Sequence, residues 1–342
     1  MYRRSRISGN SRIGQQRFAA MYTTKTTGGC FLVWLGRSYG KDVRCVKKKS
    51  LGYARKRAGI LFVLPSMTVL AVFVFIPLIV AVIFSFFNFN MMLTNFQFQG
   101  VGNYQKLFHD GKFFNALWNT IYYTVCTVPL QIMLSLIAAV LVKRQSWFHS
   151  FCKTVFFIPA ICSMTVISII WSFLINKDIG VFCYWIECLG FKPIDLLKST
   201  TWAMPTVILI GVWKKLGFYM VILLAGLNGI DETYYEAAEI DGAGGLQKFW
   251  KITVPMLMPT LSFTIVDCII GSFQVFDQVY VMTQGGPLFK TQTLVQLIYS
   301  TAFESFDMGY ASTIAVALFV LTFVVSVLTF RRMTRNEQSV MM

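Results

Sequence analysis

Residues 59–87 read GILFVLPSMTVLAVFVFIPLIVAVIFSFF, a run of 29 positions without Lys, Arg, Asp, Glu or His. An α-helix rises about 1.5 Å per residue, so about 20 apolar residues cross the roughly 30 Å hydrocarbon core of a bilayer. The run is long enough to cross it. Inside lipid, every backbone polar group must be paired within a helix or a closed barrel. The run therefore predicts a membrane-spanning helix.

Further apolar runs of similar length follow along the chain. They are Trp118–Val142, Thr154–Leu174, Ala203–Leu227, Thr260–Met282 and Ala311–Phe330. Charged residues make up 13% of the chain and hydrophobic residues 56%, whereas soluble domains carry about 25% charged residues. We expect an all-α integral membrane protein with six transmembrane helices. The run Val181–Leu189 is too short to span and is expected to form an exterior amphipathic turn of helix.

Basic residues are concentrated at the N-terminus. Residues 1–57 hold 15 Lys and Arg and one acid, whereas the remaining 285 residues hold 16 basic and 14 acidic residues. This pattern argues against a protein that coats nucleic acid with a basic surface, and no nucleic-acid partner is expected. The leader lacks the continuous apolar region of a signal peptide. We interpret it as a disordered cytoplasmic segment; the alternative is a polybasic arm that binds anionic membrane lipid.

The distribution of Lys and Arg between loops predicts the orientation of the spans. With the N-terminus inside, inner segments carry 23 Lys and Arg and outer loops six; without the leader the ratio is eight to six. Because cytoplasmic loops are enriched in Lys and Arg, both termini are expected in the cytoplasm. Lys214 and Lys215 fall inside the fourth span.

The motifs of catalytic and nucleotide-binding sites are missing from the sequence. Gly40-Lys41 and Gly111-Lys112 lack the Gly spacing and the following Ser or Thr of a nucleotide-binding loop. The two histidines, His109 and His149, fall on opposite sides of the predicted membrane, and the eight cysteines show no metal-ligand spacing. We therefore predict no catalytic residue, metal or cofactor, so that uphill transport would need energy from a partner or an ion gradient.

The longest inner loop, between the fourth and fifth spans, has a distinctive local pattern. Residues 236–259 read EAAEIDGAGGLQKFWKITVPMLMP. Asp231 can cap a helix, the three glycines at 242, 244 and 245 break it, and Pro255 and Pro259 precede the next span. The loop therefore predicts a short helix–Gly–helix knob that projects into the cytoplasm, with small residues at its tip and an acidic rim.

The pattern E-A-A-x-x-D-G-A, then F, then I-x-x-P-x-x-x-P, is filled at every position over 24 residues. These positions are Glu236, Ala237, Ala238, Asp241, Gly242, Ala243, Phe249, Ile252, Pro255 and Pro259. The loop resembles the cytoplasmic loop of permease subunits of binding-protein-dependent ABC importers. The resemblance implies the type-1 permease fold with a cytoplasmic coupling helix, and assigns contact with the ATPase subunit to Glu236, Ala237, Ala238, Asp241, Gly242 and Ala243.

Other motifs are similar to those of the maltose and glycerol-3-phosphate type of sugar-importer permease. They include Gly100, Asn103, Tyr104, Leu107 and Phe108; Phe156–Pro159; Trp213, Lys214, Gly217 and Phe218; Phe276, Asp277 and Tyr280; and Gly285–Pro287. The match covers roughly residues 57–335, but the leader has no counterpart in it. Residues 180–193 are poorly matched, which puts contacts with an external receptor there in doubt.

The resemblance also implies a location in the inner or plasma membrane of a prokaryotic cell, a set of partners and a division of the chain. The partners are a second homologous permease subunit, two ATP-binding subunits and an extracellular or periplasmic solute-binding protein, and the solute is a carbohydrate or related polar molecule. We divide the chain into the leader (1–57), the first helix with its exterior loop (58–114), a five-helix core (115–330) with the coupling loop (231–259), and a cytoplasmic tail (331–342).

Polar groups inside spans are candidates for the transport pathway, because ionisable residues in lipid are costly. The candidate substrate-pathway residues are Lys214, Asp267, Phe273, Gln274 and Asp277; Gln131 and Lys215 are also intramembrane. A lysine of span four can pair with Asp267, so a structural or inter-subunit role competes with substrate contact. Trp171, Trp213 and Phe273 can stack on sugar rings or simply pack.

These intramembrane charges leave a second class of function open. An autonomous secondary transporter or channel could use the same Asp and Lys groups, as, more remotely, could a membrane-embedded enzyme. Secondary carriers often repeat their span pattern, and no convincing second copy of residues 236–259 or of any span is present. The sequence therefore favours a transporter subunit that is not itself an enzyme and that relies on ATP hydrolysis in a partner.

Overall fold

A computed structural model describes residues 48–340, apart from positions 91, 93–95, 144, 145, 191 and 193. The predicted leader lies outside the described residues as far as position 47. The chain separates into two units, Met1–Leu64 and Pro65–Met342. In the first unit, the described residues are helical and form the beginning of helix α1 (Lys48–Leu70).

The second unit is helical apart from one short strand pair. After α1 the elements are the π-helical turn η2 (Ala71–Phe75), α2 (Ile76–Phe84), β1 (Phe87–Asn88), β2 (Gln97–Phe98), α3 (Gly102–His109), α4 (Gly111–Leu141), α5 (Trp147–Ile161), α6 (Met164–Leu174), α7 (Val181–Cys188) and α8 (Ala203–Asn228). Then follow α9 (Thr233–Ile240), α10 (Gly245–Lys248), η3 (Phe249–Thr253), α11 (Val254–Met256), α12 (Met258–Phe273), α13 (Asp277–Met282), α14 (Leu294–Tyr299), η4 (Ser300–Glu304) and α15 (Met308–Val340). The strands pair antiparallel, with Phe87 opposite Phe98.

Five helical segments of the described chain are long and apolar enough to cross a membrane. They are Gly59–Phe84, Gly111–Leu141, Ala203–Asn228, Met258–Met282 and Met308–Met333. The expected third span, Thr154–Leu174, is not one straight helix in the structure. Helices α5 and α6 meet at a bend of 99°, and they make a sixth span only if the bent pair is counted as one span. Pro159 removes a helical donor, and Cys162 then adopts an extended conformation with ψ of 151°. The extended residue breaks the helix.

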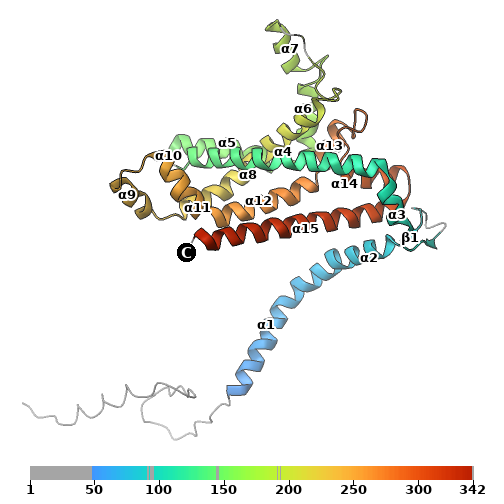
Figure 1. The fold of residues 1–342 in the computed structure, drawn as a ribbon, viewed down its shortest axis with the longest axis horizontal. Coiled ribbons are helices and arrows are strands. Elements are labelled where there is room, and N and C mark those ends of the chain that lie inside the picture. The colour runs from blue at the N-terminus through green and yellow to red at the C-terminus, as the bar shows by residue number, and fades with distance from the viewer. Residues whose placement is uncertain are drawn as a thin grey trace, which may run out of the picture. The chain divides into compact units, whose positions relative to one another are not determined.

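Helices α4, α8, α12 and α15 lie side by side and form the body of this unit (Figure 1). Tyr219 and Met220 of α8 are fully buried. Helix α8 approaches α5 closely at Gly217, where a Cβ atom would lie 2.0 Å from the carbonyl oxygen of Phe156. Only glycine allows the two backbones to meet at this distance, because any side chain would overlap the α5 backbone.

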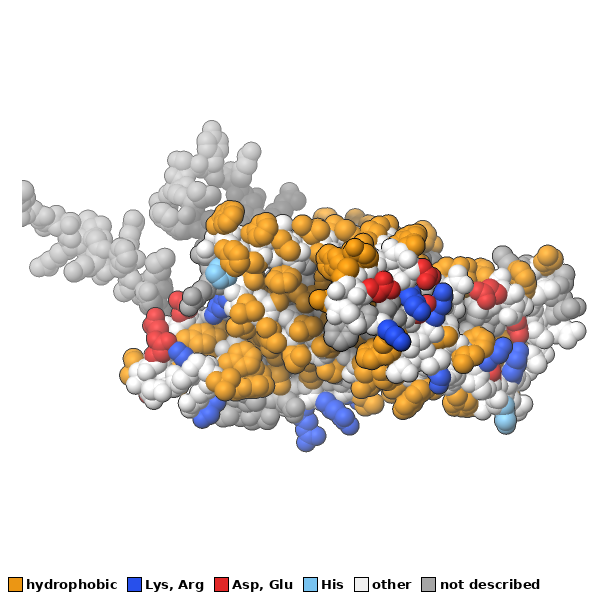
Figure 2. All heavy atoms as spheres, turned by 90° about the horizontal axis from the view of Figure 1, so that it is seen from above, with side chains coloured by type: hydrophobic (Ala, Val, Ile, Leu, Met, Phe, Trp, Pro, Cys, Tyr) orange, Lys and Arg blue, Asp and Glu red, His pale blue; other side chains and the backbone are white. Residues whose placement is uncertain are grey.

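Polar and apolar side chains divide along the length of the helices. Figure 2 shows hydrophobic side chains over much of the visible face, with acidic and basic groups near both ends and one further group of them right of the middle. Large apolar side chains such as Val125, Phe319 and Phe323 are exposed on α4 and α15. An exposed apolar middle between charged ends is the surface expected of a protein surrounded by lipid.

Candidate functional site

The inner-loop knob predicted from the sequence is present, and its first helix is capped. Asp231 Oδ1 accepts hydrogen bonds from the backbone N–H and the hydroxyl of Thr233, both at 3.0 Å, at the start of α9. These hydrogen bonds lower the pKa of the Asp231 carboxyl below its usual range, because they favour its charged form. The predicted capping role of Asp231 is confirmed.

The helix ends in a left-handed glycine turn. Gly242 has φ of +77°, and the N–H of Ala243 donates to the carbonyl of Ala238 at 2.8 Å. This is the arrangement that commonly terminates a helix with glycine. The ammonium of Lys248 on α10 donates to the carboxylate of Glu239 on α9, which lowers the pKa of Glu239. The turn and the ion pair hold the two short helices together.

A tyrosine anchors the knob to the transmembrane helices. The Tyr235 hydroxyl lies 2.9 Å from Thr253 Oγ1, and Lys143 Nζ lies 4.8 Å from the centroid of its ring. The ring also packs against a buried cluster that includes Leu224 of α8 and Leu257 before α12. Sequence reasoning missed these contacts, because Tyr235 and Thr253 are 18 residues apart in an irregular segment. The knob is therefore attached to the ends of two spans.

The predicted coupling residues lie on the outer surface of the knob. Glu236, Ala237, Asp241 and Gly242 are exposed, and Ala238 and Ala243 are half-buried. Two apolar side chains that the sequence analysis did not select are also exposed, Ile240 by 87% and Leu246 by 76%. Both residues flank the glycine turn in the sequence, and this position could have predicted that they are exposed at the tip. The tip thus combines small residues, carboxylates and apolar groups, which suits a protein–protein contact.

A second functional feature is a small polar cavity of about 170 Å³ among the spans. It lies where the fifth span is interrupted: α12 ends at Phe273, α13 begins at Asp277, and Phe276 between them has a non-helical φ of −138°. Thr293 Oγ1 donates to the carbonyl of Val275 at 3.0 Å, which pairs one backbone group of the break. Non-helical backbone at membrane depth is tolerated where it lines a cavity or is buried in protein.

The cavity contains polar atoms that the protein leaves unpaired. Thr127 Oγ1 and Gln131 Oε1 are buried without a hydrogen-bond partner in the described part of the chain, and both residues line the cavity. On the other side, the Gln278 amide donates to the Tyr123 hydroxyl. Sequence reasoning missed Tyr123, Thr127 and Gln278, because hydroxyls and amides inside a helix do not stand out from its apolar pattern. Unpaired acceptors of this kind can receive hydroxyl donors.

Three of the predicted substrate-pathway residues come together in this cavity, and two do not. Lys214, Gln274 and Asp277 line it, together with Lys215. Phe273 is instead buried in an apolar cluster. Asp267 accepts a hydrogen bond from the Tyr219 hydroxyl at 3.2 Å.

The ion pair considered between a lysine of span four and Asp267 is absent. Over the described residues, the ion pairs are Lys106–Asp307, Lys198–Asp195 and Lys248–Glu239. The tyrosine satisfies the Asp267 carboxylate instead, and this leaves Lys214 and Lys215 facing the cavity.

The aromatic residues considered for sugar stacking pack against one another. Trp171 meets Trp213 edge-on with centroids 5.5 Å apart, and it stacks on Phe182 of α7 at 5.6 Å. The described residues contain no group of three or more His, Cys, Asp or Glu side chains that could hold a metal ion.

Comparison with known families and curated proteins places the chain among transport components. Residues 100–335 match the family model "Binding-protein-dependent transport system inner membrane component". The chain is 33% identical over 276 residues to the probable ABC transporter permease protein YurN of Bacillus subtilis, covering 79% of this chain and 94% of the relative. It is also 33% identical to the lactose transport system permease protein LacF of Rhizobium radiobacter, covering 80% of this chain and 92% of the relative.

Solved structures show the same fold. A chain of a bacterial alginate ABC transporter, crystallised with an alginate pentasaccharide-bound periplasmic protein, superposes with a TM-score of 0.75 at 18% identity. The superposition covers 84% of this chain and 97% of the other. A second structure of a bacterial ABC transporter that imports alginate gives a TM-score of 0.73 and 19% identity, covering 84% and 99% of the two chains.

Proposed function

Since the chain belongs to the family of binding-protein-dependent transport system inner membrane components, we propose that it couples ATP hydrolysis to carbohydrate import through the knob at residues 231–259. It is a multi-pass membrane protein with the type-1 importer fold, and it is a permease subunit rather than an enzyme. ATP hydrolysis lies in separate subunits. The complete importer would combine this chain with a second homologous permease, two ATP-binding subunits and an external solute-binding protein.

The observation that carries the proposal is the exposed knob tied to the ends of two spans. Helix α9 follows α8 directly, and Tyr235 links it to Thr253, just before α12. When the ATP-binding subunits close on ATP, a rigid knob held in their cleft would move with them. Because α8 and α12 both line the intramembrane cavity, this motion would change the access of the cavity from one side to the other.

The chemistry of the intramembrane cavity supports a polar solute that carries hydroxyl groups. Its lining contains two lysines and one carboxylate together with the unpaired acceptors of Thr127 and Gln131. Sugar hydroxyls donate to such acceptors and accept from ammonium groups. The names of relatives point the same way: LacF is a lactose permease, and the arabinooligosaccharides transport system permease protein AraP of Bacillus subtilis is 31% identical over 83% of this chain.

The orientation in the membrane forms part of the proposal. We place the knob and both termini in the cytoplasm, as the distribution of Lys and Arg favours. Helices α3 and α14 lie toward the end of the bundle opposite α9 (Figure 1), and this end would then face the external binding protein.

The proposal is tested by reconstituting the complete transporter with a Glu236→Lys variant. The wild type should co-purify with an ATP-binding subunit, and solute uptake into vesicles should require ATP. Glu236→Lys reverses a charge on the exposed rim of the knob, so it should abolish uptake while the protein inserts at the normal level. Glu187→Lys, at an exposed position on α7, is the matched control and should leave the ATP-binding subunit attached. Uptake driven by a proton or sodium gradient without any ATPase would instead identify a secondary transporter.

A further inference from the structure

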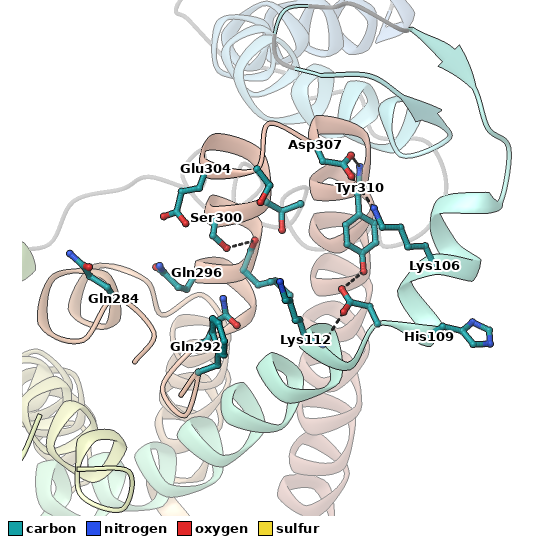
Figure 3. Close-up of a pocket in the computed structure, with 15 residues that line it drawn as sticks. Lys106, His109, Lys112, Gln284, Gln292, Gln296, Ser300, Glu304, Asp307 and Tyr310 are labelled. Carbon is teal, nitrogen blue, oxygen red and sulfur yellow. Dashed lines mark hydrogen bonds and ion pairs between the residues drawn. The ribbon is translucent and has the colours of Figure 1, made fainter. Parts of the chain in front are cut away.

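A cavity of about 600 Å³ lies at the end of the bundle opposite the knob. Its walls come from five segments: the end of α3, the beginning of α4, the loop between α13 and α14, the segment α14–η4 and the beginning of α15 (Figure 3). It shares no lining residue with the intramembrane cavity. In the proposed orientation it opens to the exterior, so it is a separate site at the mouth of the pathway.

One wall is a network of charged groups that already satisfy each other. Lys106 Nζ lies 2.9 Å from Asp307 Oδ2 and 4.1 Å from the centroid of the Tyr310 ring. The Tyr310 hydroxyl donates to Asp110 Oδ2 at 2.7 Å, and Asp110 Oδ1 accepts from the backbone N–H of Lys112. In Figure 3 this network lies on the side opposite Gln284, Gln292 and Gln296. Because both carboxylates already accept hydrogen bonds within the network, it acts as a wall of the cavity rather than as a free ion site.

The opposite wall holds acceptors without donors. Gln292 and Gln296 are 6% and 3% exposed, line the cavity, and have Oε1 atoms without a hydrogen-bond partner in the described chain. Buried amide oxygens in folded proteins are nearly always paired. These two positions are supported by the fold, since the Gln292 carbonyl accepts from Asn119 Nδ2 at 3.0 Å. Two buried acceptors, one on Gln292 just before α14 and one on Gln296 within it, therefore await donors from a bound molecule.

The remaining groups of the cavity suit a ligand that carries hydroxyl groups. Lys112 and Glu304 line it with one charge of each sign, and neither forms an ion pair with another described residue. Ser300 and Thr301 add hydroxyls. Phe289, which is 54% exposed, adds an aromatic face that can cover the C–H groups of a ring. The whole lining holds two lysines and three carboxylates, and its uncharged groups offer several donors, several acceptors and one apolar surface.

We infer that this cavity is an exterior subsite for a neutral carbohydrate, occupied before the solute enters the intramembrane cavity. Hydroxyl groups of the sugar donate to Gln292 Oε1 and Gln296 Oε1, and its ring lies against Phe289. The volume falls within the roughly 300–1,000 Å³ of small-molecule sites. The inference rests on the proposed function for the solute class and for the side of the membrane that the cavity faces. A donor side chain of the external binding protein is the alternative occupant that the experiment must distinguish.

The experiment measures protection of a cysteine placed in the cavity. Ser300→Cys is introduced into the full chain after the exposed Cys162 and Cys188 are replaced by Ala, and the complete transporter is expressed in cells that lack the external binding protein. Intact cells are labelled with a membrane-impermeant methanethiosulfonate in the presence of glucose, maltose or raffinose in separate samples. Gln105→Cys, exposed on α3 and outside the cavity, is the matched control.

We expect at least one of the three sugars to slow labelling of Ser300→Cys several-fold and to leave Gln105→Cys unchanged. Gln296→Leu removes one acceptor and should weaken the protection about fivefold to tenfold, the usual effect of losing one hydrogen bond to a buried group. Gln292→Leu is an independent second variant. An unchanged labelling rate without sugar shows that either variant has folded.

Three other outcomes have different meanings. If no sugar protects Ser300→Cys, or if protection is the same in both leucine variants, the exterior subsite is refuted. If protection appears only when the external binding protein is added without sugar, the occupant is a protein side chain and the inference is also overturned. If Ser300→Cys reacts in inverted vesicles but not in intact cells, the proposed orientation fails instead.

Discussion

A substitution at Gly242 tests the role of the knob, because the effect of backbone strain there can be distinguished from the effect of a steric clash. Its φ of +77° lies in the left-handed region, and a Cβ atom added there would meet nothing within 4 Å. An alanine would therefore cause no clash, and its cost is the backbone strain alone, about 1–2 kcal/mol. Gly244, two residues on, has an ordinary φ of −68° and equally open surroundings, so alanine there should cost almost nothing.

The strain at Gly242→Ala should appear as a loss of coupling. A cost of about 1–2 kcal/mol shifts the balance between the formed and the open turn by roughly 5- to 30-fold. In vesicles that contain the complete transporter, the solute transported per ATP hydrolysed should therefore fall in Gly242→Ala. It should stay at the wild-type value in Gly244→Ala. Gly242→Asn should fall between them, because asparagine tolerates the left-handed region better than alanine.

Two results would contradict this reasoning. Wild-type transport per ATP in Gly242→Ala would mean that the turn does not transmit the motion of the ATP-binding subunits. An equal loss in Gly244→Ala would mean that the loop senses any added methyl group, for example by contact with a partner, and not the backbone conformation of Gly242.

Three further predictions concern the fold, the anchor of the knob and the intramembrane cavity. Gly217→Ala places a Cβ atom 2.0 Å from the Phe156 carbonyl oxygen and should lower the free energy of unfolding by about 1–3 kcal/mol. The thermal midpoint of the purified protein should therefore fall. An unchanged midpoint would exclude the close contact of α5 and α8. Tyr235→Phe removes the hydrogen bond to Thr253, which stabilises the knob by about 1 kcal/mol. The variant should transport less solute per ATP hydrolysed, while the amount of protein in the membrane stays the same. Wild-type transport per ATP would show that the ring contacts alone hold the knob. Asp277→Asn should weaken solute uptake and leave the ATP-binding subunits attached, and loss of those subunits would assign Asp277 a structural role.

Local sequence patterns predicted the helices and the knob well, because each depends on neighbouring residues. The apolar runs predicted the spans. The turn at Gly242 could be predicted because glycine adopts a positive φ more easily than other residues. The bend between α5 and α6 was missed. Pro159 is tolerated inside many membrane helices, and its effect depends on the extended Cys162 after it.

Features built from distant residues could not be predicted in this way. A lysine of span four was one possible partner for Asp267, but Tyr219, about one helical turn further along the same helix, donates to its carboxylate instead. The same holds for the hydrogen bond between Tyr235 and Thr253 and for the unpaired oxygens of Gln292 and Gln296. Both features depend on which segments pack together, and the sequence alone does not show this. The pattern of a helix shows which residues share a face, but not which residues of another helix that face will meet.

The most direct test of the coupling role is photo-crosslinking from Ile240, at the exposed tip of the knob. A photoreactive amino acid replaces Ile240 in the full chain within native membranes, and Phe108, exposed on α3 at the opposite end of the bundle, serves as the control position. The account predicts that position 240 yields an adduct with the ATP-binding subunit and that position 108 does not. An importer that remains assembled but yields no adduct from position 240, or an equal adduct from both positions, would contradict it.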